Sequence, residues 1–169
     1  GRLHRSIEDD VLLPNSSKNS VITGRLLNDD VMLFLPRDVQ LYYEARAQDE
    51  ESAVRYWSWL HDELERRNLT LLVLLVPTKY TVYRSLLRGQ ETPPPSSLYL
   101  DGLEQRLHIL NIPVLNLTPS FSSRAESKAA EKAYLYFIDD THWNADGIAL
   151  AVEEISKMWK ARLSLSDEY

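Results

Sequence analysis

The chain has 169 residues, of which 44% are hydrophobic and 26% charged, a composition typical of a globular domain rather than a disordered or fibrous chain. Lysine and arginine number 19 against 25 aspartates and glutamates, and the resulting net charge of −6 argues against nucleic acid or an anionic membrane as a partner. The absence of cysteine excludes disulfides and thiol nucleophiles. The apolar run at residues 69–77 is far shorter than the ~20 residues of a membrane-spanning helix, so no transmembrane segment is expected.

The amino-terminal residues predict an arm followed by a folded domain. Residues 1–23 are rich in Asp, Asn, Ser and Pro and read as an irregular arm, whereas residues 24–169 are expected to form the domain. Within residues 24–35, two short apolar stretches flank an Asn-Asp-Asp turn signal and predict a β-hairpin. The chain begins with Gly and lacks an apolar signal core, so we expect a processed or excised piece.

The middle of the chain predicts a β-α-β unit. Apolar side chains recur at helical spacing over residues 49–67, and residues 69–76 follow as a continuous apolar run, typical of a parallel strand covered on both faces by helices. A second amphipathic helix near residues 100–110 leads to a strand at 112–117. The predicted fold is α/β, with a mostly parallel sheet and flanking helices.

The last third of the chain alternates between short helical and strand-like patterns. Residues 123–132 predict a short exposed helix or a mobile excursion, and residues 134–137 predict a strand. Asn144 is placed to cap a long amphipathic helix that carries the apolar side chains that follow it.

The segment between this strand and the capped helix carries the most informative side chains. Asp140 and His142 lie two residues apart, a spacing at which a carboxylate can accept a hydrogen bond from imidazole Nδ1–H. Such a carboxylate fixes the tautomer of the ring and stabilises the imidazolium while Nε2 takes a proton from a hydroxyl. Asp140 and His142 are therefore the candidate catalytic residues, two of the three groups of a serine-hydrolase relay.

Other interpretations of these residues stay open at this point. An Asp-x-His triplet before a helix is also typical of a capping turn, which predicts that the Asp140 carboxylate lies beyond hydrogen-bonding distance of the His142 ring. A metal site would need more ligands than Asp139, Asp140 and His142. No glycine-rich phosphate loop is present, and we expect neither a cofactor nor a metal.

The run Asp140-Thr141-His142-Trp143 resembles a signature of the SGNH-hydrolase-like domains of the alginate O-acetyltransferase AlgX/AlgJ family. Two upstream segments are similar to that family as well. Val76-Pro77-Thr78-Lys79 followed by Tyr83 resembles its Val-Pro-x-Lys-x-x-x-Tyr element, and residues 28–35 resemble its Gly-x-Asp-Gly-Trp-Leu-Phe entry, without the Gly and the Trp. The three segments occur in the family's order.

The resemblance implies an SGNH-hydrolase-like domain over residues 24–169, with Asp140 and His142 as part of a Ser-His-Asp relay. In that family the serine follows in a Gly-Asp-Ser-like turn, and this sequence has no Gly-Asp-Ser. Ser164 and Ser166 are expected in a polar tail, without the strand and glycine that a nucleophile turn requires. Two explanations stay open: the chain is the amino-terminal part of a larger domain, or it kept the fold and lost the nucleophile.

The resemblance further implies an O-acetyltransferase or acetylesterase-like domain that acts on a bacterial exopolysaccharide in the periplasm. Its expected partners are the polysaccharide, an acetyl donor that is a protein or a small molecule, and other proteins of the exopolysaccharide machinery. The alternative is a non-catalytic carbohydrate-binding or assembly module on the same scaffold. Whether the protein is an enzyme depends on a nucleophile supplied beyond this chain.

Overall fold

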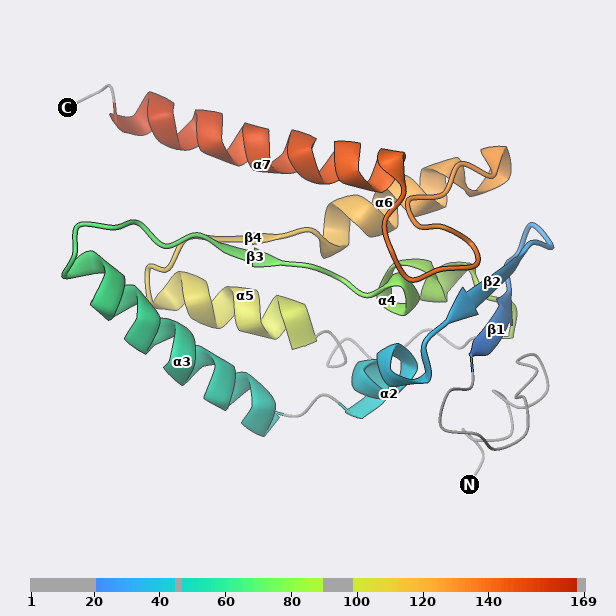
Figure 1. The fold of residues 1–169 in the computed structure, drawn as a ribbon, viewed down its shortest axis with the longest axis horizontal. Helices are drawn as coiled ribbons and strands as arrows, with labels where there is room; N and C mark the ends of the chain where they lie inside the picture. The colour runs from blue at the N-terminus through green and yellow to red at the C-terminus, as the bar shows by residue number, and fades with distance from the viewer. Residues whose placement is uncertain (1–20, 45–46, 90–98, 167–169) are drawn as a thin grey trace.

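Two small sheets are joined and flanked by helices in the part of the chain that the structure describes (Figure 1). The computed structural model describes residues 21–44, 47–89 and 99–166. The elements are β1 (Ile22–Arg25), β2 (Val31–Phe34), α2 (Pro36–Glu44), α3 (Ala47–Glu65), β3 (Val73–Leu75), α4 (Lys79–Tyr83), the 3₁₀ turn η1 (Arg84–Leu86), α5 (Tyr99–Ile109), β4 (Val114–Asn116), α6 (Thr118–Lys128), the 3₁₀ turn η3 (Ala129–Glu131) and α7 (Ala145–Ser166). Among the described residues, no helix is both long and apolar enough to cross a membrane. Most of the arm predicted at residues 1–23 lies outside the described residues.

An antiparallel hairpin comes first, and it confirms the prediction for residues 24–35. Strands β1 and β2 pair across the turn that the Asn-Asp-Asp signal indicates. Asp29 in this turn has a φ of 73°, a left-handed conformation that Asn and Asp tolerate better than most residues. Met32 and Phe34 are buried, whereas Val31 is exposed, as expected of a strand with one face on a core.

The predicted β-α-β unit is also present. Strands β3 and β4 pair in parallel, with Val73 opposite Val114. Helices α3 and α5 pack against each other, and Figure 1 shows both on the same side of these strands. Their side chains share one hydrophobic core with the sheet, made of Val54, Val73, Leu75, Leu103, Leu107, Ile112 and Val114.

The sheets differ from the prediction in two respects. The described residues hold one antiparallel and one parallel sheet of two strands each, so a mostly parallel sheet is not confirmed. The expectation that residues 69–76 are covered on both faces is wrong, because Leu74 is 36% exposed and Val76 is 46% exposed. With α3 and α5 on one side, only the face that carries Val73 and Leu75 is buried. A continuous apolar run cannot distinguish a strand buried on one face from one buried on both.

A larger core joins the hairpin to α4, α6 and the start of α7. Its members include Phe34, Val82, Tyr83, Leu117, Phe121, Leu135, Tyr136 and Leu150. The strand predicted at residues 134–137 is wrong: Tyr136 forms only an isolated bridge with Trp143. The apolar character of this segment comes from side chains that fill the core rather than from a ladder of strand pairs.

Asn144 caps α7, as its position in the sequence predicts. Its side-chain Oδ1 accepts hydrogen bonds from the backbone N–H groups of Asp146 (3.0 Å) and Gly147 (3.1 Å). Its Nδ2 donates to the carbonyl oxygen of Tyr134 at 2.6 Å. The cap therefore also ties the helix to the segment that precedes the candidate catalytic residues.

The close approach of α7 to the backbone of Leu135 requires a glycine at position 147. A Cβ atom at Gly147 would lie 2.2 Å from the carbonyl oxygen of Leu135. Helix propensity alone predicts that Gly147→Ala stabilises the protein by up to about 1 kcal/mol. We expect the opposite, a loss of about 2–3 kcal/mol in the free energy of unfolding, because the backbone must shift to relieve the clash. Urea denaturation measures this change.

The matched control is Ala149→Gly, an exposed position on the same helix. It should cost about 1 kcal/mol through propensity alone. A Gly147→Ala protein that is as stable as the parent protein, or more stable, would contradict the packing described for this junction.

Candidate active site

The candidate catalytic residues lie on a closed loop between Tyr136 and Trp143. The isolated bridge of these two residues closes the loop, and the backbone N–H of Phe137 donates to the carbonyl oxygen of His142 at 3.2 Å. In Figure 1 this loop descends from the start of α7 to the side of α4 and β2. The segments that surround the loop come from distant parts of the sequence.

Asp140 and His142 contact each other as the relay requires. The Nδ1 atom of His142 lies 2.8 Å from Oδ1 of Asp140. The same oxygen accepts hydrogen bonds from the backbone N–H groups of Thr141 and His142. The hydrogen bond with His142, followed by that from Thr141, lowers the pKa of the Asp140 carboxyl below its usual value. An ionised Asp140 favours the tautomer that carries its proton on Nδ1 and leaves Nε2 able to accept one.

This contact contradicts the distance that a simple capping turn predicts. Both side chains of the pair are open to solvent: 81% of the His142 side chain and 53% of the Asp140 side chain are exposed. Exposed ion pairs contribute little to stability. The arrangement therefore sets the orientation of a ring rather than holding the fold together.

Lys79 holds the loop in place from below. The residue is only 1% exposed, and its ammonium group donates hydrogen bonds to three backbone carbonyl oxygens of the loop, those of Phe137 (2.6 Å), Ile138 (3.0 Å) and Asp140 (2.9 Å). These three bonds use all the N–H donors of the ammonium group. Nζ also lies 5.5 Å from the ring centroid of Phe34, within the range of a cation–π interaction.

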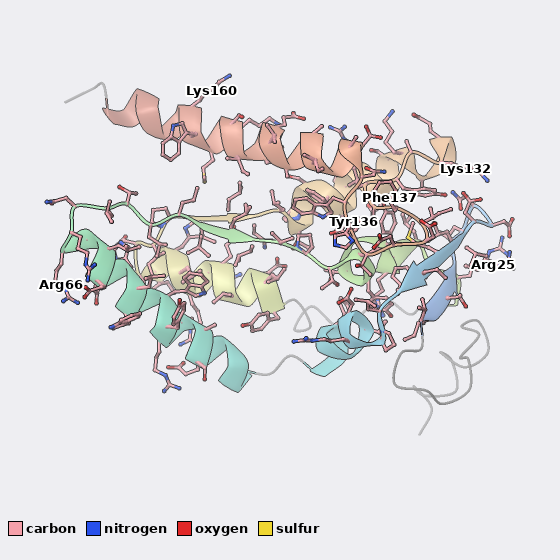
Figure 2. The ribbon with its side chains drawn as sticks, viewed as in Figure 1. Arg25, Arg66, Lys132, Tyr136, Phe137 and Lys160 are labelled. Atoms are coloured by element: carbon pink, nitrogen blue, oxygen red, sulfur yellow. The ribbon has the colours of Figure 1, made fainter. Side chains whose placement is uncertain are left out.

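Two tyrosines add further hydrogen bonds between residues 135–136, where the loop begins, and residues 77–83. The hydroxyl of Tyr136 donates to the carbonyl oxygen of Pro77 at 2.7 Å, and that of Tyr83 accepts from the backbone N–H of Leu135 at 2.7 Å. Figure 2 shows Tyr136 and Phe137 in the region between α7 and α4. Together with Lys79, these contacts join the strand-end segment to the loop.

An open pocket of about 540 Å³ lies beside His142. Its walls are mainly apolar, as is usual for sites that bind small ligands. They are formed by Leu35, Asp38, Val76, Pro77, Thr78, Lys79, Tyr136, Thr141, His142, Trp143 and Ile148. Trp143 is held by a ring contact with Phe121, with 5.1 Å between centroids.

The nucleophile of a relay is not among the groups that line this pocket. Of the residues that the structure describes, no serine lines it. Ser164 and Ser166 belong to the last turn of α7, so the expectation of a polar tail there is wrong. A search of the described residues finds no group of three or more histidines and carboxylates that could hold a metal ion.

The patterns in the sequence do not indicate that two residues, Lys79 and Asp38, line this pocket. Lys79 belongs to the resemblance alone, and its burial does not follow from local pattern. The signal in the sequence is a lone lysine three residues after the apolar run at residues 69–76. No motif or spacing in the sequence gives Asp38 a role in a site. An acid in the first turn of a helix usually complements the helix dipole, so its position carried no separate signal.

The chain belongs to a family of SGNH-hydrolase-like domains. A family model described as "SGNH hydrolase-like domain, acetyltransferase AlgX" matches residues 29–168, most of the chain. No curated protein and no solved structure shows a significant match. The match includes strand β2, Lys79 and the loop that carries Asp140 and His142.

Lys79→Met should loosen the loop, because it keeps the length of the side chain but leaves three carbonyl oxygens without their donor. We expect a loss of about 2–4 kcal/mol in the free energy of unfolding, the cost of unmade hydrogen bonds to a charged group. Amide hydrogen exchange at Thr141 and His142 should accelerate as well. Denaturation and exchange measured by NMR test both effects.

Lys128→Met is the control, since the Lys128 side chain is 40% exposed and its only ion pair among the described residues is with Glu131. It should change stability by no more than about 0.5 kcal/mol. Equal effects of the two substitutions would show that Lys79 does not hold the loop.

The titration of Lys79 offers an independent test. Burial lowers the pKa of its ammonium group to about 8, against the opposing effects of Asp139 and Asp140. Because this value lies below that of an exposed lysine, the unfolded chain binds more protons between about pH 8 and pH 10.5. The contribution of this group to the free energy of unfolding therefore rises with pH in that window.

NMR of the lysine ζ-nitrogens measures the midpoint directly. The midpoint of Lys79 should lie near pH 8, whereas that of Lys157 should lie above 10.5, because hydrogen bonds with Glu153 and Glu154 raise its pKa. A Lys79 midpoint at or above that of Lys157 would contradict the burial described here.

Proposed function

We propose that this domain takes part in O-acetyl transfer or acetyl-ester hydrolysis on a bacterial exopolysaccharide outside the cytoplasm. The observation that carries the proposal is the 2.8 Å contact between Asp140 and His142 beside a pocket, in a chain that belongs to the SGNH-hydrolase-like acetyltransferase family. Nε2 of His142 has no hydrogen-bond partner among the described residues, so it can serve a ligand.

The proposed chemistry is acyl transfer in two steps. A serine hydroxyl attacks the carbonyl carbon of an acetyl ester while His142 Nε2 accepts its proton, and the proton then passes to the departing alkoxide. A sugar hydroxyl or water attacks the acetyl-enzyme in the second step, again with His142 as the base. Asp140 holds the ring and stabilises the imidazolium. The serine would be supplied by sequence beyond these 169 residues.

The test compares acetyl release from 4-nitrophenyl acetate by the complete gene product with that by its His142→Ala variant. Loss of a general base should lower kcat/KM by about 10²–10⁴-fold. A fluorophosphonate probe should label one serine in the parent protein and should do so more slowly in the variant by a similar factor. Mass spectrometry of the labelled peptide then identifies the nucleophile.

His108→Ala is the matched control, because His108 is also exposed and lies 3.8 Å from a carboxylate, that of Glu104. It should leave the rate unchanged. Equal acetyl release by the parent protein and His142→Ala would exclude the catalytic role. If the parent protein and the variant still bind a saccharide, that result would support the alternative, a carbohydrate-binding or assembly module.

A further inference from the structure

Tyr56 and Trp59 place two neighbouring aromatic rings on the solvent side of α3. The residues are 53% and 58% exposed, and their ring centroids lie 6.1 Å apart with the planes tilted by 41°. Trp57, which packs against the core beneath α3, meets the ring of Tyr56 edge-on with 5.2 Å between centroids. A side chain anchored in the core therefore orders the exposed rings.

These rings point away from the core and lie apart from the pocket. Successive residues are about 100° apart around a helix, so Tyr56 and Trp59 lie on the side of α3 opposite the buried Val54. In Figure 1 α3 lies at the lower left, whereas the loop of Asp140 and His142 lies to the right. A ligand on the rings would thus occupy a second site.

Arg55 adds a positive charge beside the rings. The residue is exposed, and among the described residues its guanidinium makes one long hydrogen bond, to the hydroxyl of Ser52 at 3.5 Å, and no ion pair. Nearby carboxylates on α3 are held by other cations: Glu51 pairs with Arg106, and Glu63 pairs with two arginines of its own helix. The Arg55 guanidinium can therefore bind a carboxylate of a ligand through two parallel hydrogen bonds.

The surroundings of the rings favour a saccharide over a protein partner. The other side chains that share this side of α3 are polar or charged: Ser52, Arg55, Asp62 and Glu63. The core of a protein interface is depleted in serine and acidic residues, so this mixture does not suit one. A sugar unit presents both kinds of surface, because its C–H face packs against an aromatic ring while its hydroxyl and carboxylate groups reach the polar rim.

We propose that Arg55, Tyr56 and Trp59 bind a stretch of an acidic saccharide chain, with sugar units against the rings and a carboxylate on the guanidinium. The identity of the ligand as a saccharide rests on the proposed function. Since this surface lies apart from His142, it would hold units of the chain other than the one that reacts and raise the local concentration of acceptor at the pocket. The net charge of −6 gives no long-range attraction for such a chain, so contacts on α3 would supply the affinity.

The test titrates β-1,4-hexamannuronate into the complete gene product at physiological salt, and the indole N–H signal of Trp59 should shift with ligand. Trp59→Ala, followed through the Nε–H signal of Arg55, should weaken binding about tenfold, whereas Trp59→Phe keeps a ring and should weaken it about threefold or less. Arg55→Gln should weaken hexamannuronate binding about fivefold. It should leave the binding of β-1,4-mannohexaose, which lacks carboxylates, unchanged.

Two matched variants serve as controls. Trp159→Ala removes another exposed tryptophan, on α7. Arg66→Gln removes the same charge as Arg55→Gln from the same helix, but the Arg66 guanidinium is held by Glu63 at 2.8 Å. Each control should change the affinity for hexamannuronate by less than about twofold, because charges beyond a Debye length are largely screened.

Four results would each overturn the proposal: no shift of the Trp59 signal, equal weakening by Trp59→Ala and Trp159→Ala, unchanged hexamannuronate binding in Arg55→Gln, or a dimer in sedimentation that Trp59→Ala dissociates. The acetyl-release assay separates these failures from that of the proposed function. Trp59→Ala should release acetyl from 4-nitrophenyl acetate at the parent rate, since this small ester makes no use of α3. Saccharide binding at Trp59 without release that depends on His142 would keep this surface and reject the relay, and the reverse would keep the relay and reject this surface.

Discussion

The buried ammonium group of Lys79 is the interaction on which the site depends. Removing a charged amine from water costs several kcal/mol, and the protein offsets part of this cost with three carbonyl oxygens and the face of Phe34. These carbonyls belong to the loop of Asp140 and His142, so the requirement to satisfy one charge also fixes the path of the backbone that presents the pair. The exposed contact between Asp140 and His142 is too weak to hold that backbone by itself.

The same requirement makes the site a product of tertiary structure. The hairpin contributes Phe34 and also the backbone N–H of Leu33, which donates to the carbonyl oxygen of Ile138 at 2.8 Å. That carbonyl thus receives one bond from the hairpin and one from Lys79. Three segments that are more than 40 positions apart along the chain meet at the loop. Any change that separates the hairpin from α4 should therefore reach His142 without touching it.

The sequence patterns predict local features well and tertiary ones less so. The hairpin turn, the helix at residues 49–67 and the cap at Asn144 depend on neighbouring residues, and the structure has all three. The expectation that residues 69–76 are covered on both faces is wrong, because the hydrophobicity of a strand does not reveal which of its faces are covered. Neither the burial of Lys79 nor the place of Asp38 in a pocket follows from local pattern, since each depends on segments distant in sequence.

The exposure of the pair has a consequence for the choice between transfer and hydrolysis. Under the proposed function, acetyl transfer to a sugar would compete with water at the acetyl-enzyme, and an open His142 would admit both nucleophiles. A saccharide that fills the apolar pocket excludes water from the ring and lowers the local dielectric, which strengthens the interaction between Asp140 and the imidazolium. Under the proposed function, the acceptor itself therefore completes the environment that the described residues leave open. Binding of the acceptor and the suppression of hydrolysis would then share one physical cause, the close fit of a sugar ring against the apolar wall of the pocket.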